Sequence, residues 1–352
     1  MANMNIRTPR FYVDSISYRL SRGVAQNGVY DVQGTSTGNN LVGIKSGGGT
    51  EADLFDMKPL NLVTFDTAAS VASKADGVVL SLDTMGETSS KHSFVAILNH
   101  NLVTATGRFK IAASDTKAQI EIFDWHASAT KIEPTEIING DTIDGSSPFE
   151  VTPATDGSTI VKFAESDLRY WGIQFEGSDS DNFSGTDLTV GCVLMGEIYE
   201  MPHAPDMSVK RAIIFDQVDI VESAGGQRFG NMTSHGRTAS STSKSPFTTS
   251  TVAQQVFGGR IAYNLNFSYL ASTDVMPDEY DIYNPADDST VEDIWNKTNG
   301  QHLPFIFSID KSSEGDNAES EHIFARFKQD SLNMTQVAND FFNISMHIEE
   351  EF

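Results

Sequence analysis

The sequence predicts an all-β fold, and two observations support this prediction. Apolar and polar residues alternate with a period of two in several segments, a pattern that is typical of strands buried on one face. Clusters of Gly, Ser, Asp, Asn and Pro separate these segments, and these are the residues that form turns. The spacing favours two β-sandwich or jelly-roll-like domains with extended arms over alternating strands and helices.

The alternation also indicates which side chains face a core. A short segment has Ile120 and Ile122 on its apolar side, and a longer one ends with Phe267 and Tyr269. We expect all four side chains to face inward, because successive strand residues point to opposite faces. The expected strands cover residues 108–113, 119–122, 170–176, 263–269, 322–328 and 342–348.

One segment predicts a short helix, at about residues 290–298. Ser289 and Glu292 have the spacing of a capping box, in which the two side chains satisfy free backbone N–H groups. Apolar residues then recur at helical spacing as far as Trp295, and Gly300 supplies a stop.

Composition divides the chain into three parts. Residues 1–50 form an N-terminal arm or extended segment, which ends in the glycine-rich run 46–49, a flexible joint. Residues 51–203 form a first β-sandwich domain. A proline-rich linker at 201–205 leads into the second β domain, residues 206–352.

The second domain contains a long Ser/Thr-rich loop at about residues 230–252. Its centre includes Arg237 and Lys244, and no acidic residue lies between Thr233 and Thr251. A loop of this length in a compact domain is usually either functional or disordered. Two interpretations remain open: a floppy surface loop, or an assembly arm that orders against the acidic body of a neighbouring subunit.

Charge and composition limit the classes of partner. The chain has 352 residues and a formal net charge of -24, so it repels phosphate backbones and anionic membrane surfaces. We therefore expect no nucleic-acid partner. No run of about 20 apolar residues occurs, so we expect no membrane insertion. The charge itself is explained either by solubility at high concentration or by attraction to cations or to a basic partner subunit.

The single cysteine and the N-terminus indicate where the chain is made. Cys192 lies in an apolar run, so we expect a buried, inert thiol, and one cysteine cannot form an intrachain disulfide. The N-terminal residues lack the apolar stretch of a secretory signal. Both features fit assembly in a reducing cytoplasm.

Catalytic motifs are weak. Residues 34–38 match the pattern of a nucleophile elbow around Ser36, but no helical periodicity follows, as that motif requires. We find no phosphate loop, dinucleotide fingerprint, Cys/His metal cluster or carboxylate pair spaced for hydrolysis. The sequence therefore predicts no enzyme activity, no catalytic residues and no cofactor-binding residues.

One acidic loop has the spacing of calcium ligands. Asp310, Ser312 and Glu314 occupy the first, third and fifth positions, and Glu321 occupies the twelfth. The flanking segments predict strands, however, whereas such loops normally lie between helices. A solvated hairpin loop is the favoured interpretation, and a weak calcium site is the alternative.

Three segments of the first domain show a resemblance to known proteins. Residues 94–102, 169–175 and 193–199 resemble the jelly-roll modules of phage tail and other virion proteins. Those modules are similar to galactose-binding or discoidin-type domains. The resemblance spans roughly residues 55 to 200 and rests on apolar patterning.

The second domain shows a related resemblance. Its predicted helix leads to residues 303–307, 324–327 and the closing strand into 349–352. That series resembles tail-tip and distal-tail proteins of long-tailed phages.

These resemblances imply a non-enzymatic structural subunit of a bacteriophage particle, at the tail tip or baseplate. Such a protein would be found in the virion after assembly in the host cytoplasm, and its partners would be other virion proteins and copies of itself. Two alternatives stay open: a capsid decoration or vertex protein, and a receptor-binding module that recognises a host surface glycan.

Overall fold

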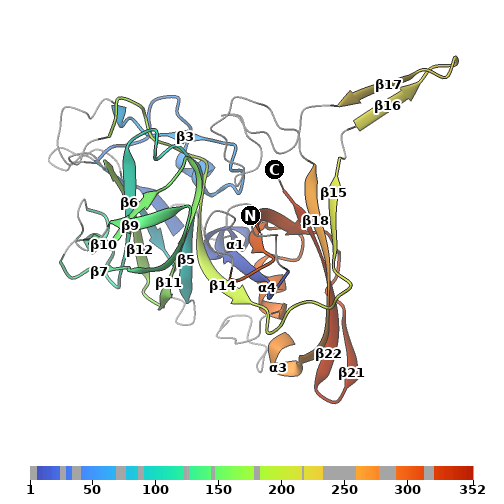
Figure 1. Cartoon of the computed structure of the whole chain (residues 1–352). Helices are drawn as coiled ribbons and strands as arrows, with labels where there is room; N and C mark the ends of the chain where they lie inside the picture. The colour runs from blue at the N-terminus through green and yellow to red at the C-terminus, as the bar shows by residue number, and fades with distance from the viewer. Residues whose placement is uncertain are drawn as a thin grey trace.

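A computed structural model shows an all-β chain, as the alternation predicts. Strands account for most of its secondary structure (Figure 1). The structure describes residues 6–23, 29–33, 41–68, 77–85, 91–122, 125, 127–143, 147–177, 183–215, 218–232, 259–276, 291–312 and 321–351.

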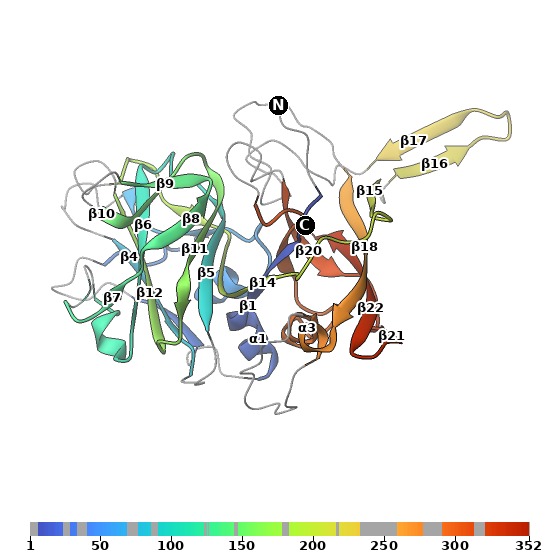
Figure 2. The same ribbon diagram turned by 60° about the horizontal axis from the view of Figure 1, so that its bottom comes forward.

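One large antiparallel sheet runs through the molecule and contains strands from both halves of the chain (Figures 1 and 2). In spatial order its strands are β15 (Lys210–Ile214), β18 (Arg260–Ala271), β22 (Phe341–Glu350), β20 (His322–Phe327), β19 (Phe305–Ser308), β1 (Arg10–Asp14), β14 (Cys192–Glu200), β5 (His92–His100), β11 (Gly157–Ser166) and β8 (Pro134–Ile138), with β21 (Met334–Ala338) paired to β22.

A second sheet packs against the first-domain part of the large sheet and completes a β-sandwich. Its strands are β2 (Tyr30–Val32), β4 (Val78–Asp83), β12 (Tyr170–Gly177), β6 (Gly107–Ser114), β10 (Ser147–Pro153) and β9 (Gly140–Ile143), with β7 (Thr130–Lys131) paired to β6. Two strand pairs stand apart: β3 (Val63–Thr64) with β13 (Thr189–Val190), and β16 (Val218–Glu222) with β17 (Arg228–Met232).

Three α-helices are described: α1 (Ser15–Ser21), α3 (Ser272–Val275) and α4 (Val291–Lys297), together with 3₁₀ turns at Glu51–Phe55 and Lys117–Gln119. Helix α4 confirms the predicted helix, whereas the expectation of one helix only is wrong. The missed helix α1 begins where the Asp14 carboxylate accepts the Ser17 backbone N–H at 2.6 Å, which is an N-cap.

Two hydrophobic cores lie on the same face of the large sheet. Met195 of β14 belongs to the first core, and Tyr199 of the same strand belongs to the second. Residues four positions apart on a strand face the same side. The first core is closed by the second sheet, and the second by the bending of the large sheet and by α3 and α4. The cores therefore share one strand as a common wall.

A third, smaller cluster lies on the opposite face of this sheet, where the two halves of the chain meet. Tyr12 of β1, Phe94 of β5 and Phe324 of β20 are buried together there. Strand β1 pairs with β14 on one side and with β19 on the other, and every one of its residues is buried. Of the two descriptions expected for the N-terminal residues, an arm or an extended segment, residues 10–14 fit the second, because they form an extended interior strand that joins both halves.

The glycine-rich run 46–49 is also not the flexible joint that we expected. Gly48 donates to the Lys45 carbonyl at 2.8 Å and accepts from the Thr64 N–H at 2.7 Å. Gly47 and Gly49 have positive φ angles of 77° and 97°, a conformation that suits glycine. The run is an ordered turn against β3.

Most of the expected strands are confirmed as β6, β12, β18, β20 and β22. Two details are wrong. Gln119 ends the 3₁₀ turn Lys117–Gln119, and residues 120–122 follow it without forming a strand, so that Ile122 is exposed. Tyr269 is also exposed, because the register of β18 shifts and Leu270 takes the expected inward place. Ser36 and the Ser/Thr-rich stretch from residue 233 to 252 lie outside the described residues.

Candidate functional site

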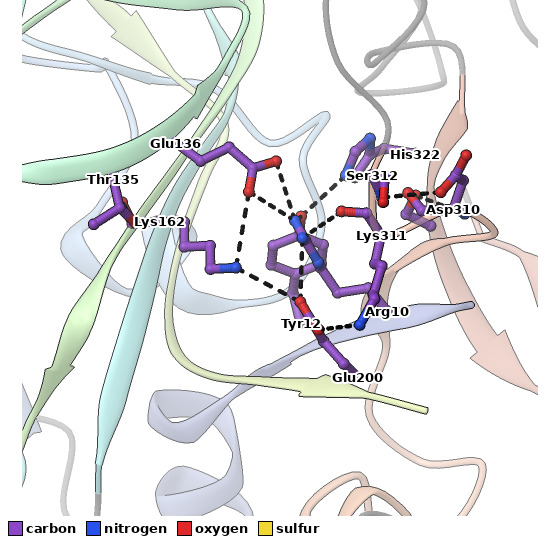
Figure 3. A network of polar contacts seen from close by, with 11 residues as sticks. Arg10, Tyr12, Thr135, Glu136, Lys162, Glu200, Asp310, Lys311, Ser312 and His322 are labelled. Atoms are coloured by element: carbon purple, nitrogen blue, oxygen red, sulfur yellow. Dashed lines mark hydrogen bonds and ion pairs between the residues drawn. The ribbon is translucent and has the colours of Figure 1, made fainter. Parts of the chain in front are cut away.

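A polar network joins the two halves of the chain on the face of the third cluster (Figure 3). At its centre Arg10 of β1 contacts both oxygens of Glu136 on β8 at 3.2 Å and Glu200 on β14 at 3.2 Å. It also donates to the Tyr12 hydroxyl at 3.1 Å and to the Lys311 carbonyl. We call these residues, together with Lys162 and His322, the Arg10 network.

The surrounding residues complete the pairing of charges. Lys162 lies 3.8 Å from Glu136 and 3.6 Å from Glu200, and Lys311 lies 3.0 Å from Glu200. Although partial burial acts to raise the pKa of Glu200, these cations and Arg10 hold it below its ordinary value. Burial raises the pKa of Tyr12 to about 12, so the phenol keeps its proton at neutral pH.

The Arg10 network is suited to holding the fold together. Arg10 is 4% exposed, and each of its charged partners is itself paired within the network. Tyr12 lies 3.1 Å from His322 Nε2, which links β1 to β20 of the second half. Removing one member of such a network leaves buried groups without partners. Its geometry therefore indicates a structural lock between the halves.

The second feature is a projecting hairpin formed by β16 and β17 (Figures 1 and 2). Both views show it extending away from the body of the molecule. Val221 and Phe229 are cross-strand partners and are 58% and 59% exposed, and Ile220 is 61% exposed. Several exposed apolar side chains that lie together on one projecting hairpin are typical of an interaction surface.

Sequence reasoning missed this hairpin. The apolar residues of β16 suggest a buried strand, and nothing local shows that the strand leaves the body. The available signal was the turn-forming run Ser-Ala-Gly-Gly at residues 223–226. In the structure the Ser223 N–H donates to the Gln227 carbonyl at 2.8 Å and closes this turn.

The third feature is a groove on the outer face of the second half, with a volume of about 320 Å³. It lies beside β21 and β22. Its lining is polar, except for one isoleucine, and consists of Gln329, Ser331, Asn333, Thr335, Asn343, Ile344, Ser345 and His347. We call it the outer groove.

The calcium loop is described only at its ends. Asp310 Oδ1 accepts the Ser312 N–H at 2.9 Å, and Oδ2 lies 3.6 Å from Arg7. Glu321 is buried just before β20, and Glu314 lies outside the described residues. Within the described ranges, no three His, Cys, Asp or Glu side chains are grouped so that they could hold a metal. The weak calcium site stays a prediction.

Other expected residues are placed as core. Cys192 is fully buried, and burial raises the pKa of its thiol well above the ordinary value. Trp171 is also fully buried and donates to the Leu168 carbonyl at 2.7 Å. None of the helices described is long and apolar enough to cross a membrane.

Comparison with known proteins identifies no family for this chain. No protein-family model matches the sequence, and no curated protein matches it significantly. Among solved structures, the chain is similar to chitosan-binding module 1 of a chitosanase/glucanase from Paenibacillus sp. IK-5, with 12% sequence identity and a TM-score of 0.30. The similarity covers 49% of this chain and 96% of that module. At this level it supports no inference about function.

Proposed function

We propose that this chain is a non-enzymatic structural subunit that assembles with copies of itself through the β16–β17 hairpin. The exposed apolar residues of this hairpin carry the proposal. Leaving Ile220, Val221 and Phe229 in water costs free energy that a contact with another subunit recovers. A permanent contact between subunits typically buries 2,000 Å² or more in total, so we expect the hairpin to be one part of a wider interface.

The construction of the body supports the same proposal. A subunit that transmits force, or that sets the positions of its neighbours in an assembly, needs its two halves held in one orientation. The continuous sheet and the Arg10 network provide this, because strand β1 is bonded to both halves. With each copy contacting the next in the same way, head-to-tail contacts close into a ring if the rotation allows it.

The location that we propose for this assembly rests on the sequence resemblance alone. We propose a bacteriophage virion, with the tail tip or baseplate as the position and other virion proteins as further partners. Immunogold labelling of intact particles tests this position. Label on tail tips supports it, label on heads favours the capsid decoration protein, and particles without label contradict both.

The oligomeric mass of the purified full chain tests the assembly. We expect wild-type protein to form an oligomer, and the double variant Val221→Ser/Phe229→Ser to elute as a single chain in size-exclusion chromatography with light scattering. Both side chains are exposed, so the substitutions should leave folding intact, as circular dichroism would show.

A matched control uses exposed apolar residues that lie on the body and not on the hairpin. Leu60 and Val103 are 42% and 44% exposed. The variant Leu60→Ser/Val103→Ser should assemble like wild type. A monomeric wild type, or equal masses for wild type and the hairpin variant, would contradict the proposal.

A further inference from the structure

We propose that the outer groove binds a short stretch of a neutral oligosaccharide, with Tyr269, which lies next to the lining residue Asn343 and is not itself part of the lining, as a neighbouring stacking platform. This inference concerns a different surface from the hairpin and does not rest on the assembly of the chain. It is carried by the position of the groove, by the chemistry of its lining and by the unusual backbone that presents Tyr269.

The groove lies where the edge of β22 changes partners. Residues Phe341–Ile344 of β22 pair with β21, and residues Ile348–Glu350 pair with β20. No described strand pairs with this edge between them, and the chain that follows β20 runs beside it, with the Lys328 N–H donating to the His347 carbonyl at 2.9 Å. Gln329 Oε1 accepts the His347 N–H at 2.8 Å, which satisfies the backbone at this edge. Within the lining Asn333 donates to Ser331 at 3.1 Å, and Ser345 donates to Asn266 at 2.8 Å, so a ligand would use the remaining donors and acceptors of these side chains.

The lining contains no carboxylate and no ammonium or guanidinium group. This stands out in a chain with 48 acidic residues and a net charge of -24. Asp330 lies between two lining residues in sequence, but its carboxylate accepts from the Gln301 amide at 2.8 Å. Amide and hydroxyl groups that both donate and accept are complementary to sugar hydroxyls, and a cationic ligand would find no carboxylate among these residues. His347 is the one titratable side chain in the lining.

The aromatic platform is held by a β-bulge. Phe267 pairs with Ile344 and Leu270 with Phe342, so both Ser268 and Tyr269 oppose Asn343 of the groove. Tyr269 has a φ of 61°, which is a rare conformation for a bulky residue, and its N–H donates to Asn343 Oδ1 at 3.0 Å. Its side chain is 66% exposed. Strain of this kind is often retained at functional sites.

A second aromatic side chain lies on the same face. Phe341 precedes Asn343 by two residues on β22, so both point outward, and Phe341 is 42% exposed. An exposed aromatic ring offers an apolar surface to the C–H face of a sugar ring, while adjacent amides bind its hydroxyls. The groove volume is at the lower end of the range for small-ligand sites, roughly 300 to 1,000 Å³, which suits a short segment of a glycan.

Saturation-transfer NMR on the full chain tests the proposal with defined probes. The probes are maltohexaose, cellohexaose, xylohexaose, mannohexaose and N-acetylchitohexaose, and hexagalacturonic acid serves as the anionic comparison. We expect at least one neutral probe to bind and the anionic probe not to bind. Titration calorimetry with the bound probe should show an affinity loss of about ten-fold or more in Tyr269→Gly and in Thr335→Val.

These variants separate binding from folding. Glycine accepts a positive φ without strain, so Tyr269→Gly should leave the melting temperature unchanged or raise it while affinity falls. Thr335→Val keeps the shape of an exposed side chain and removes its hydroxyl. Asn296→Ala, an exposed amide on α4, is the matched control and should bind like wild type.

Three results would overturn the inference, two of them from the binding experiments. One is the absence of binding to every neutral probe. The other is binding that survives both groove variants unchanged, which would place the sugar elsewhere. Burial of Tyr269 between assembled copies, seen as protection in hydroxyl-radical footprinting, would identify the face as a subunit interface and would also overturn it.

Discussion

His100 links the stability of the first half to pH. The ring is buried, its Nδ1 accepts the Leu102 N–H at 3.3 Å, and its Nε2 lies 2.9 Å from Thr159 Oγ1. Thr159 in turn donates to the Asn139 carbonyl at 3.1 Å. This chain of bonds requires a neutral ring that is protonated at Nε2, because a proton on Nδ1 would displace the Leu102 N–H. Burial lowers the pKa of His100 to about 4.

The pH dependence follows from this shift. Between about pH 6.5 and pH 4 the unfolded chain binds a proton that the folded chain does not, so stability falls as pH falls through this window. We expect His100 to account for a loss of about 3 kcal/mol in the free energy of unfolding. Urea denaturation at a series of pH values measures it. His100→Gln should flatten the curve, and the exposed His302→Gln should not; equal curves for all three would refute the assignment.

Tyr269 shows where sequence reasoning fails at the residue scale. The alternation placed it on the core face with Phe267, and the register shift puts it outside. A bulge adds one residue to one strand. The sequence does not reveal this one, because Leu270, which takes the inward position, is apolar like Tyr269. The residues of the outer groove were missed for a similar reason, since scattered Ser, Thr and Asn carry no spacing that marks a site.

At the scale of elements, the approach of β1 to β14 depends on Gly196. A Cβ at this position would lie 1.9 Å from the Val13 carbonyl oxygen and 2.9 Å from the Ser15 N. We expect Gly196→Ala to lower the free energy of unfolding by at least about 3 kcal/mol, because backbone atoms of two buried elements must move. Gly230→Ala, where the added Cβ meets nothing within 4 Å, should change it by less than about 1 kcal/mol. Equal effects in chemical denaturation would refute the close approach.

The Arg10 network gives a second prediction for the junction. Arg10→Ala leaves Glu136 and Glu200 with fewer partners, and we expect a loss of about 2–4 kcal/mol. Arg169 forms a similar pair with Asp83 at 2.8 Å, but its side chain is 39% exposed. Arg169→Ala should therefore cost no more than about 1 kcal/mol. Thermal denaturation compares the two, and a smaller effect for Arg10 would contradict its role as a lock.

The sequence predicts elements better than it predicts their pairing. The alternation identified β6, β12, β18, β20 and β22, because each carries its own period-two pattern. Asp14 could have identified α1, since an N-cap followed by Ile16 and Leu20 is a local signal. No local pattern records that β1 lies between β14 and β19, because these partners are far away in the sequence.

At the scale of the whole molecule, the chain is built as one body with a projection. Both hydrophobic cores are built on the same sheet, and the Arg10 network and the third cluster hold its other face. The hairpin carries the cross-strand apolar pair Val221–Phe229 into solvent on an element that projects from the body. Because each copy carries a net charge of -24, contact between copies has to overcome mutual repulsion, and added salt should strengthen it by screening.

Electron cryomicroscopy of the assembled particle tests the central claim most directly. The account predicts that the β16–β17 hairpin of each copy lies against a neighbouring subunit, with Val221 and Phe229 buried in the contact. A reconstruction in which these two side chains face solvent in every copy would contradict it.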